Sequence, residues 1–496
     1  MLAQALLDTL APLPIFYIFI GVALGCIVGA IPGLTGSMLI VLTLPLTFYM
    51  DSTLAMILLV AMYVGSISGG LITATLLRMP GTPSSIMTTL DGYPMAQQGK
   101  AGRALGIGIM ASFVGGIVAW IFMVLVAPPL GKIAVKFGPF EYFSMVVMAL
   151  VLIASVSEGS FLKGIISGLL GLLVATPGID PGTAVPRLDF GFNEMAGGFH
   201  ILPVLIGLFG ISQIITDIVN IDQKPEKVPM KFSNLFMSLR DLKKQAVNLI
   251  RSSVIGTWVG ILPGIGANIG SIIAYGAAKN MSKTPEKFGT GHDEGVVASE
   301  AANNATVSGA LIPLITLGIP GSIIDAILLG AMYIHNVQPG PLLFKTNPEM
   351  AYGVMSSALV ANIFMLFIMV GATFFIAKIV DIHKAYIIPA IIVFCIIGSF
   401  ALHNRMFDVW VMFGFGLLGF GLERCKVPLA PFIIGLILCP LAELPIRQGL
   451  MATGGSLAPL VTRPASLIFL IISALTFVWT IYQEVRKANK SKSAKV

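Results

Sequence analysis

The sequence predicts an all-α protein that crosses a membrane many times. Of its 496 residues, 56% are apolar and only 11% are charged, and the mean hydropathy is +0.93. Soluble domains carry about 25% charged residues, so lipid rather than water is the solvent that fits this composition. The 54 glycines and 30 prolines also fit, because membrane helices tolerate residues that break helices in water.

Apolar segments follow one another along the whole chain. About 20 apolar residues are needed to cross the hydrocarbon core as a helix, and several segments are too short to do so alone. We therefore expect about 10–12 full crossings, with the short segments forming re-entrant hairpins or the halves of broken helices. The segments lie near residues 15–31, 35–49, 53–77, 104–127, 140–157, 160–177, 200–219, 248–262, 266–278, 305–317, 322–335, 353–380, 386–400, 406–421, 427–441 and 465–482.

Positive charge is concentrated in residues 222–251 and 483–496. These segments hold seven and five basic residues against three and one acidic residues, respectively. Loops rich in lysine and arginine stay in the cytoplasm, so both segments are predicted to be cytoplasmic, and a role in nucleic-acid binding is disfavoured. The predicted organisation is a first membrane repeat (1–221), a basic cytoplasmic linker (222–251), a second membrane repeat (252–482) and a basic cytoplasmic tail (483–496).

The two membrane halves share sequence blocks in the same order. Gly25-xxx-Gly29-xx-Pro-Gly33 recurs as Gly256-xxx-Gly260-xx-Pro-Gly264, and Ser68-Gly69 leading to Pro80-Gly81 recurs as Ser308-Gly309 leading to Pro320-Gly321. Two ordered matches, at offsets of 231 and 240 residues, predict an internal duplication. The second repeat would enter the membrane from the cytoplasmic linker and the first from an uncharged N-terminus outside, so we expect the repeats to be inverted.

Each Pro-Gly step lies inside an apolar run and predicts a broken helix. Proline lacks an N–H donor, and glycine adopts backbone angles that other residues avoid. A break at membrane depth leaves amide donors at the start of one half-helix, which suit an anion, and carbonyl acceptors at the end of the other, which suit a cation. An isolated step is more often a plain kink, but four steps at equivalent positions favour a binding site.

Small and hydroxylated residues follow these steps and offer donors to a carboxylate without burying a charge. Arg78, just before the second step, is predicted either to pair with a substrate carboxylate or to be an ordinary interface arginine. The candidate substrate-binding residues are Thr35, Gly36, Ser37, Arg78, Gly81, Thr82, Ser84, Ser85, Gly264, Gly266, Gly321 and Ser322.

Candidates for binding a cation lie mainly in the second half. Asn303 and Asn304 offer amide oxygens of the kind that bind sodium, although hydrogen bonding between helices explains them equally well. With Gly33 and Asn268 they form the predicted cation-binding set. Glu300 and Asp325 are candidates to carry protons instead.

Motifs for enzymatic chemistry are missing. The sequence has no HExxH, no Gly-x-Ser-x-Gly and no Walker loop, and the glycines at 264–270 lack the GxGxxG spacing of a dinucleotide loop. We therefore expect no enzymatic activity and no cofactor apart from a sodium ion.

Six blocks resemble the large membrane (permease) subunit of the tripartite tricarboxylate transporter family. The likeness extends over most of residues 15–480 and is carried by residues 29–37, 80–85, 90–95, 300–304, 317–321 and 338–341. The resemblance implies a system of three parts: this permease, a small membrane subunit, and a periplasmic solute-binding protein that delivers an organic carboxylate. It also implies location in the bacterial inner membrane and symport with a cation, without ATP.

Two residues depart from the family pattern. Arg78 stands where asparagine is usual, and Asp325 stands where a small or hydroxylated residue is usual. The resemblance therefore leaves the substrate open between citrate and other carboxylates, including aromatic ones. The alternative function is an anion channel or uncoupled facilitator, which would need a continuous polar pore and no coupling ion.

Overall fold

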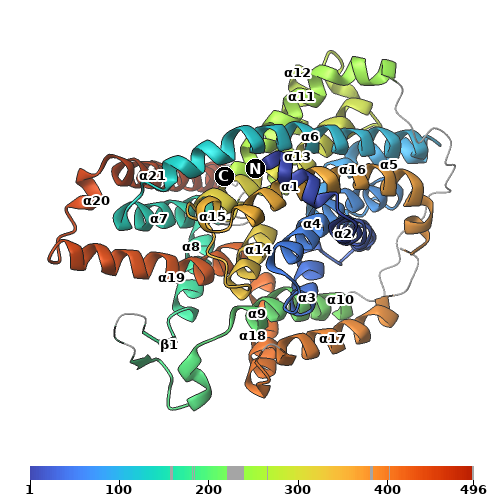
Figure 1. Cartoon of the computed structure of the whole chain (residues 1–496). Coiled ribbons are helices and arrows are strands. Elements are labelled where there is room, and N and C mark those ends of the chain that lie inside the picture. The colour runs from blue at the N-terminus through green and yellow to red at the C-terminus, as the bar shows by residue number, and fades with distance from the viewer. Residues whose placement is uncertain are drawn as a thin grey trace.

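Helices make up nearly all of the protein (Figure 1). The computed structural model describes residues 1–156, 160–180, 183, 185–219, 239–264, 266–379, 384–401 and 403–493. Within these residues the only sheet is a hairpin, in which β1 (Gly178–Ile179) pairs antiparallel with β2 (Pro186–Arg187). Of the predicted linker (222–251), residues 222–238 lie outside the described residues.

The first half contains ten α-helices in the described residues. They are α1 (Leu2–Thr9), α2 (Pro12–Ala30), α3 (Gly36–Thr47), α4 (Ser52–Leu76), α5 (Thr88–Gln97), α6 (Ala101–Ala134), α7 (Pro139–Val156), α8 (Phe161–Val174), α9 (Ile201–Leu205) and α10 (Ser212–Val219). Short helical turns η1 (Pro83–Ser85) and η2 (Asn193–Gly197) lie between them, and the π-helical turn η3 (Ile206–Ile211) joins α9 to α10 without a break.

The second half contains eleven α-helices in the described residues. They are α11 (Leu239–Ile261), α12 (Gly266–Met281), α13 (Asp293–Leu317), α14 (Ile323–Ile334), α15 (Leu343–Thr346), α16 (Pro348–Ile379), α17 (Lys384–Ala401), α18 (Met406–Arg424), α19 (Leu429–Ala452), α20 (Pro459–Thr462) and α21 (Pro464–Ser493), with η4 (Pro285–Lys287) between α12 and α13.

Eight helical segments of the described chain are long and apolar enough to cross a bilayer. They are α2, α4, α6, α9–α10, α16, α18, α19 and α21, and five shorter apolar helices accompany them. The prediction of an all-α polytopic membrane protein is therefore confirmed. Each Pro-Gly step falls between two helices, as expected for broken helices: α2 ends before Pro32, α4 before Pro80, α11 before Pro263 and α13 before Pro320.

One predicted segment was much too short. The apolar run at 305–317 is only the second half of α13, which begins at Asp293. The first half of α13 carries Glu300, Asn303 and Asn304 and therefore gives no hydropathy signal. These side chains are buried against other helices rather than against lipid, so α13 is long although half of it is polar.

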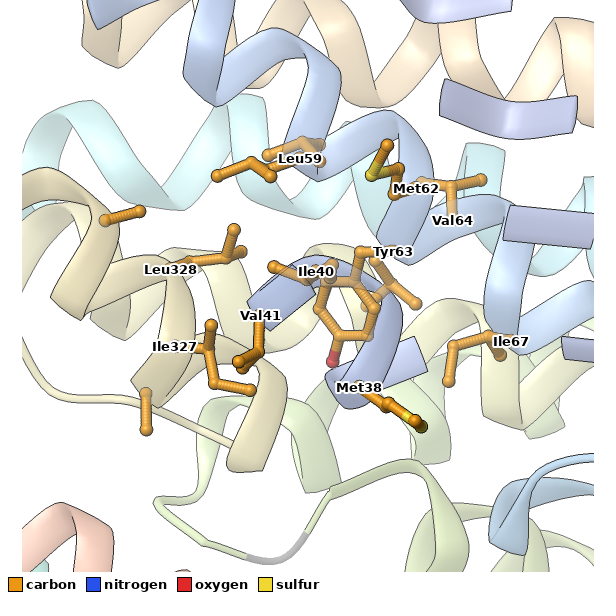
Figure 2. Packing of buried hydrophobic residues seen from close by; sticks show 14 of the residues in the cluster. Met38, Ile40, Val41, Leu59, Met62, Tyr63, Val64, Ile67, Ile327 and Leu328 are labelled. Atoms are coloured by element: carbon orange, nitrogen blue, oxygen red, sulfur yellow. The ribbon is translucent and has the colours of Figure 1, made fainter. Parts of the chain in front are cut away.

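Helix α4 lies at the centre of the fold, and α21 at its edge. The apolar window of α4 is buried throughout, whereas about a tenth of the α21 window is buried, as expected for a helix that faces lipid. Figure 2 shows Tyr63 of α4 among apolar side chains of α3 and α14, such as Ile40 and Leu328. The core thus joins helices from both halves of the chain.

Glycines allow the inner helices to pack backbone against backbone. A Cβ atom added at Gly29 of α2 would lie 2.1 Å from the carbonyl oxygen of Ser66 in α4. A Cβ atom at Gly260 of α11 would lie 2.5 Å from that of Thr306 in α13. The small-residue spacing seen in the sequence therefore serves close packing of membrane helices.

The close contacts recur at equivalent positions of the two halves. Three pairs in the first half map onto three pairs in the second half by the offsets of 231 and 240 residues that relate the sequence blocks. The pairs are Gly29 with Ser66, Gly69 with Cys26 and Gly81 with Gly29, and correspondingly Gly260 with Thr306, Gly309 with Thr257 and Gly321 with Gly260.

The β-hairpin is tied to α19 by charged side chains. Arg187 Nη1 lies 2.6 Å from Glu443 Oε1, and Arg447 Nη2 lies 2.8 Å from Asp180 Oδ2. The hydrogen bond to Glu443 raises the pKa of Arg187 above its usual value, so the guanidinium stays charged. This cluster fixes the loop that leads into α9.

Candidate substrate and cation site

The first junction presents a hydroxyl-capped helix start. Gly33 turns the chain with φ 93°, and Thr35 is the N-cap of α3, where its Oγ1 accepts a hydrogen bond from the amide of Met38 at 3.2 Å. The hydroxyls of Thr35 and Ser37 are 2.8 Å apart. Gly36 packs against Ser66 of α4, where a Cβ atom would collide with the serine side chain. The site residues predicted here therefore lie together at one helix N-terminus.

The second junction is a tight knot of hydroxyls. Thr82 Oγ1 lies 2.8 Å from Ser84 Oγ and 3.2 Å from Ser85 Oγ, and all three side chains are buried. Gly81 faces the carbonyl of Gly29 at the end of α2, so this turn lies beside the first junction. Arg78 is different: it is exposed, has φ 56°, and its guanidinium lies 5.9 Å from the ring centroid of Tyr93. Its side chain therefore stays outside the buried hydroxyl knot.

The third and fourth junctions lie in the second half. Gly264 and Gly266 have φ values of 75° and 67°, which return the chain into α12. Ser322 is the N-cap of α14, and its hydroxyl donates to Asp325 Oδ2 at 2.5 Å. Asp325 is buried, and its Oδ1 has no hydrogen-bond partner among the described residues.

Side chains from the two halves meet at these junctions. The hydroxyls of Tyr63 in α4 and Ser322 lie 3.1 Å apart, and a Cβ atom at Gly36 would lie 3.2 Å from Ile324. A Cβ atom at Gly266 would lie 3.7 Å from Ser322. The starts of α3, α12 and α14 are therefore brought to one place.

Glu300 is held in a buried network of neutral donors. Its Oε1 accepts from Thr88 Oγ1 at 2.5 Å, and its Oε2 accepts from Ser112 Oγ at 3.1 Å and from Asn303 Nδ2 at 3.2 Å. The carboxylate thus has three hydrogen bonds, and none of these donors is basic. A carboxylate desolvated in this way is stable when protonated or when a cation lies near it.

The two asparagines continue this network toward α4. Asn304 Nδ2 donates to Asn303 Oδ1 at 2.7 Å, and Ser68 Oγ donates to Asn304 Oδ1 at 2.7 Å. Both amide oxygens therefore already accept one hydrogen bond each in this arrangement. Asn268 lies at the start of α12, where its backbone carbonyl accepts a hydrogen bond from Ser271 Oγ at 2.8 Å.

Sequence reasoning missed Tyr63, Thr88 and Ser112 as members of the site. Each is a polar residue inside an apolar helix or at its edge, which is a weak signal that many structural residues share. Their partners Ser322 and Glu300 lie more than 180 residues away in the chain. The pairing is therefore visible only in the fold.

Comparisons with known proteins agree on one family. The profile of the Tripartite tricarboxylate transporter TctA family matches residues 15–434. The chain is 35% identical over 478 residues to an uncharacterized 52.8 kDa protein in the TAR-I ttuC' 3' region of Agrobacterium vitis, covering 96% of this chain and 95% of that protein. It is 32% identical over 231 residues, 47% of this chain, to an uncharacterized protein in the TAR-II ttuC' 3' region of the same organism, covering 96% of that protein.

No solved structure matches the chain. The family match covers most of the sequence, and the helical membrane fold agrees with it. The chain therefore belongs to the tripartite tricarboxylate transporter TctA family, as a multi-pass membrane transport protein whose family implies partner subunits and a solute-binding protein.

Proposed function

We propose that this protein is the permease of a secondary transporter that takes up an organic tri- or dicarboxylate, driven by a cation gradient. The observation that carries the proposal is the meeting of the Pro-Gly junctions of both halves beside two buried carboxylates, Glu300 and Asp325. Substrate and coupling ion would then bind within the same buried region.

The helix starts provide the anion subsite. The N-termini of α3 and α14 carry partial positive charge and unpaired amides, which favour a carboxylate. Thr35, Ser37 and Ser322 add hydroxyls at the same ends. The hydroxyl knot of Thr82, Ser84 and Ser85 lies at the neighbouring junction and offers further donors.

The buried carboxylates provide the coupling site. A buried charge is costly unless it is paired, and no basic residue donates a hydrogen bond to Glu300 or Asp325 in the described chain. A sodium ion bound among Asn303, Asn304 and Glu300 would supply the positive charge that pairs with the Glu300 carboxylate. A proton carried by Glu300 or Asp325 is the alternative within the same site.

The equivalent glycine contacts support the proposal that the two halves are repeats of one unit. The basic segment before the second half and the uncharged start of the first half favour an inverted orientation. Two repeats of opposite orientation give a binding site near the membrane midplane that can open to either side when one part moves against the other. The proposed system includes a small membrane subunit and a periplasmic binding protein, and it lies in the bacterial inner membrane with residues 222–251 in the cytoplasm.

Uptake into proteoliposomes tests the proposal. The permease is reconstituted with its small membrane subunit and binding protein, and accumulation of radiolabelled citrate and other carboxylates is measured with an inward sodium gradient, a proton gradient or no gradient. We expect accumulation above equilibrium with one of the two gradients. Flux that never exceeds equilibrium would instead favour an anion channel or uncoupled facilitator.

Two variants separate coupling from substrate binding. Glu300→Gln should abolish gradient-driven accumulation, because the carboxylate proposed to bind the coupling ion is lost. It should retain substrate exchange across the membrane, because glutamine has nearly the same size and shape as glutamate. Ser37→Ala, at the start of α3, should raise KM about tenfold or more, since a hydrogen bond to a charged group contributes about 1.5–3 kcal/mol. Ser473→Ala, which removes a hydroxyl bonded only to its own helix in α21, is the matched control and should transport normally.

A further inference from the structure

Three side chains of the kind that bind metals meet outside the Pro-Gly junctions. His200 is the N-cap of α9, His403 lies in the turn before α18, and Asp408 is in the first turn of α18. One nitrogen of each imidazole and one oxygen of the carboxylate all lie within 4.8 Å of one another. His403, the nearer of the other two residues in sequence, comes 203 positions after His200. The fold, rather than the local sequence, therefore assembles the group.

The distances fit a single shared ion. His200 Nδ1 lies 3.1 Å from Asp408 Oδ2, and His403 Nδ1 lies 3.3 Å from the same oxygen. Ligands at about 2.0–2.2 Å from a tetrahedral zinc ion are separated from one another by about 3.3 Å. The imidazole rings are stacked, with centroids 3.6 Å apart and an interplanar angle of 14°. Their in-plane lone pairs are therefore nearly parallel, and one ring has to turn out of the stack for both Nδ1 atoms to bind one ion.

Burial and charge also favour a cation. The side chain of Asp408 is 1% exposed, and within the described chain its ion-pair partners are these two histidines, which are 24% and 34% exposed. The nearby Arg405 is directed elsewhere: its Nη2 donates to the carbonyl of Glu194, and its guanidinium lies 5.5 Å from the ring centroid of Phe407. With neutral imidazoles the group carries one negative charge, and the partial exposure of the histidines leaves room for water as a fourth ligand.

We propose that His200, His403 and Asp408 bind one divalent transition-metal ion, with zinc as the best match to two imidazoles and a carboxylate. The ion would fasten the loop before α9 to the turn before α18. These two helices run in the same direction, since Gly207 packs against Met412 and Ile211 against Gly416. A link at their starts would therefore fix their relative position along the membrane normal. The proposal does not depend on the transport mechanism.

Zinc titration of the full-length protein tests the site. The protein is purified in detergent without a polyhistidine tag, treated with a chelator, and titrated with Zn²⁺ by calorimetry. We expect one zinc ion bound per chain and a higher apparent melting temperature with zinc than without it, because binding to the folded state stabilises it. Co²⁺ should replace zinc and give the intense visible absorption of a tetrahedral site.

Three variants decide whether these residues hold the ion. His403→Gln and Asp408→Asn should lose the stoichiometric binding, the cobalt absorption and the stabilisation. His292→Gln is the matched control, since this histidine lies 3.9 Å from Glu294 but is in no group of three metal-binding side chains among the described residues. This variant should bind zinc like the parent protein. If Asp408→Asn does not fold, His403→Gln still decides, because His403 is one-third exposed in a turn. Zinc binding that is absent in the parent, or equal in all variants, would show that the two histidines only donate hydrogen bonds to Asp408.

Discussion

Asp91 is the residue with the most demanding hydrogen-bond role outside the proposed site. Its Oδ1 accepts from the amides of Gly289, Gly291 and His292 at 2.9, 3.0 and 2.8 Å, and its Oδ2 accepts from Tyr275 Oη at 2.8 Å. The carboxylate is fully buried. It therefore joins α5 of the first half to the loop that precedes α13 in the second half.

Asp91→Ala should destabilise the protein strongly. It removes the acceptor of three backbone amides, and each of these hydrogen bonds contributes about 0.5–1.5 kcal/mol net. Tyr275→Phe removes one of the four bonds and should cost only about 1 kcal/mol. Apparent melting temperatures in detergent measure both effects, with the exposed Asp8→Ala as control. Equal melting temperatures for Asp91→Ala and Asp8→Ala would contradict the role of Asp91 as a tether.

At the scale of single residues, local sequence patterns predict where hydroxyl groups cap helices or cluster at the junctions, but not which distant residues they contact. The hydroxylated residues after the Pro-Gly steps do cap helices or cluster at junctions, because N-cap chemistry is local. Partners such as Tyr63 with Ser322 come from opposite halves and leave no local signal. Arg78 was predicted either to pair with a substrate carboxylate or to be an interface arginine. Its side chain is exposed beside Tyr93, and its role stays a prediction.

At the scale of helices, glycines at crossing points decide how closely the inner helices pack. Gly29→Ala should sharply reduce the yield of monodisperse protein, because the added Cβ would lie 2.1 Å from the backbone oxygen of Ser66 and only a backbone shift relieves the collision. Gly260→Ala should have a similar effect at the equivalent crossing, where the corresponding distance is 2.5 Å. Size-exclusion profiles and apparent melting temperatures measure the outcome.

Gly371→Ala in α16 is the matched control for these glycines. It also lies in a long membrane helix, but an added Cβ would meet nothing within 4 Å. Alanine favours a helix over glycine by about 1 kcal/mol, so this variant should be as stable as the parent or slightly more so. Tolerance of alanine at Gly29 as well would mean that α2 and α4 do not depend on close contact.

Helix positions were predictable wherever the sequence is apolar, whereas helical segments in polar sequence were not. The four breaks could be predicted because Pro-Gly is a local signal. The polar half of α13 could not be, since its charged and amide side chains are compensated by Thr88, Ser112 and Ser68 from other helices. A hydropathy pattern predicts helices that contact lipid, whereas α13 is surrounded by other helices of the protein.

At the scale of the whole molecule, contacts between helix ends give the direction of each half. Arg103 lies 3.4 Å from Asp241 and 2.6 Å from Asp293, so α6, α11 and α13 all begin at one end of the bundle. Helix α16 runs antiparallel to α6, because Trp120 bonds to Met355 and Phe113 to Asn362. The start of α4 packs at the start of α16, where Gly353 faces Thr53. Thus α4 and α13, which occupy equivalent positions in the two sequence blocks, begin at opposite ends.

Labelling of single cysteines in cells tests this orientation. In a variant that lacks the four native cysteines, Asp51→Cys places an exposed thiol before α4, and Glu286→Cys places one before α13. A membrane-impermeant maleimide should label Asp51→Cys in intact cells and Glu286→Cys only after permeabilisation, because the second half is expected to enter from the basic cytoplasmic segment.

The native Cys425 lies in the turn that follows α18 and is exposed. Its backbone carbonyl accepts a hydrogen bond from the ammonium group of Lys163. Restored alone, it serves as the internal control and should behave like Glu286→Cys. Labelling of both engineered positions from the same side would rule out inverted repeats and would require a different route for alternating access.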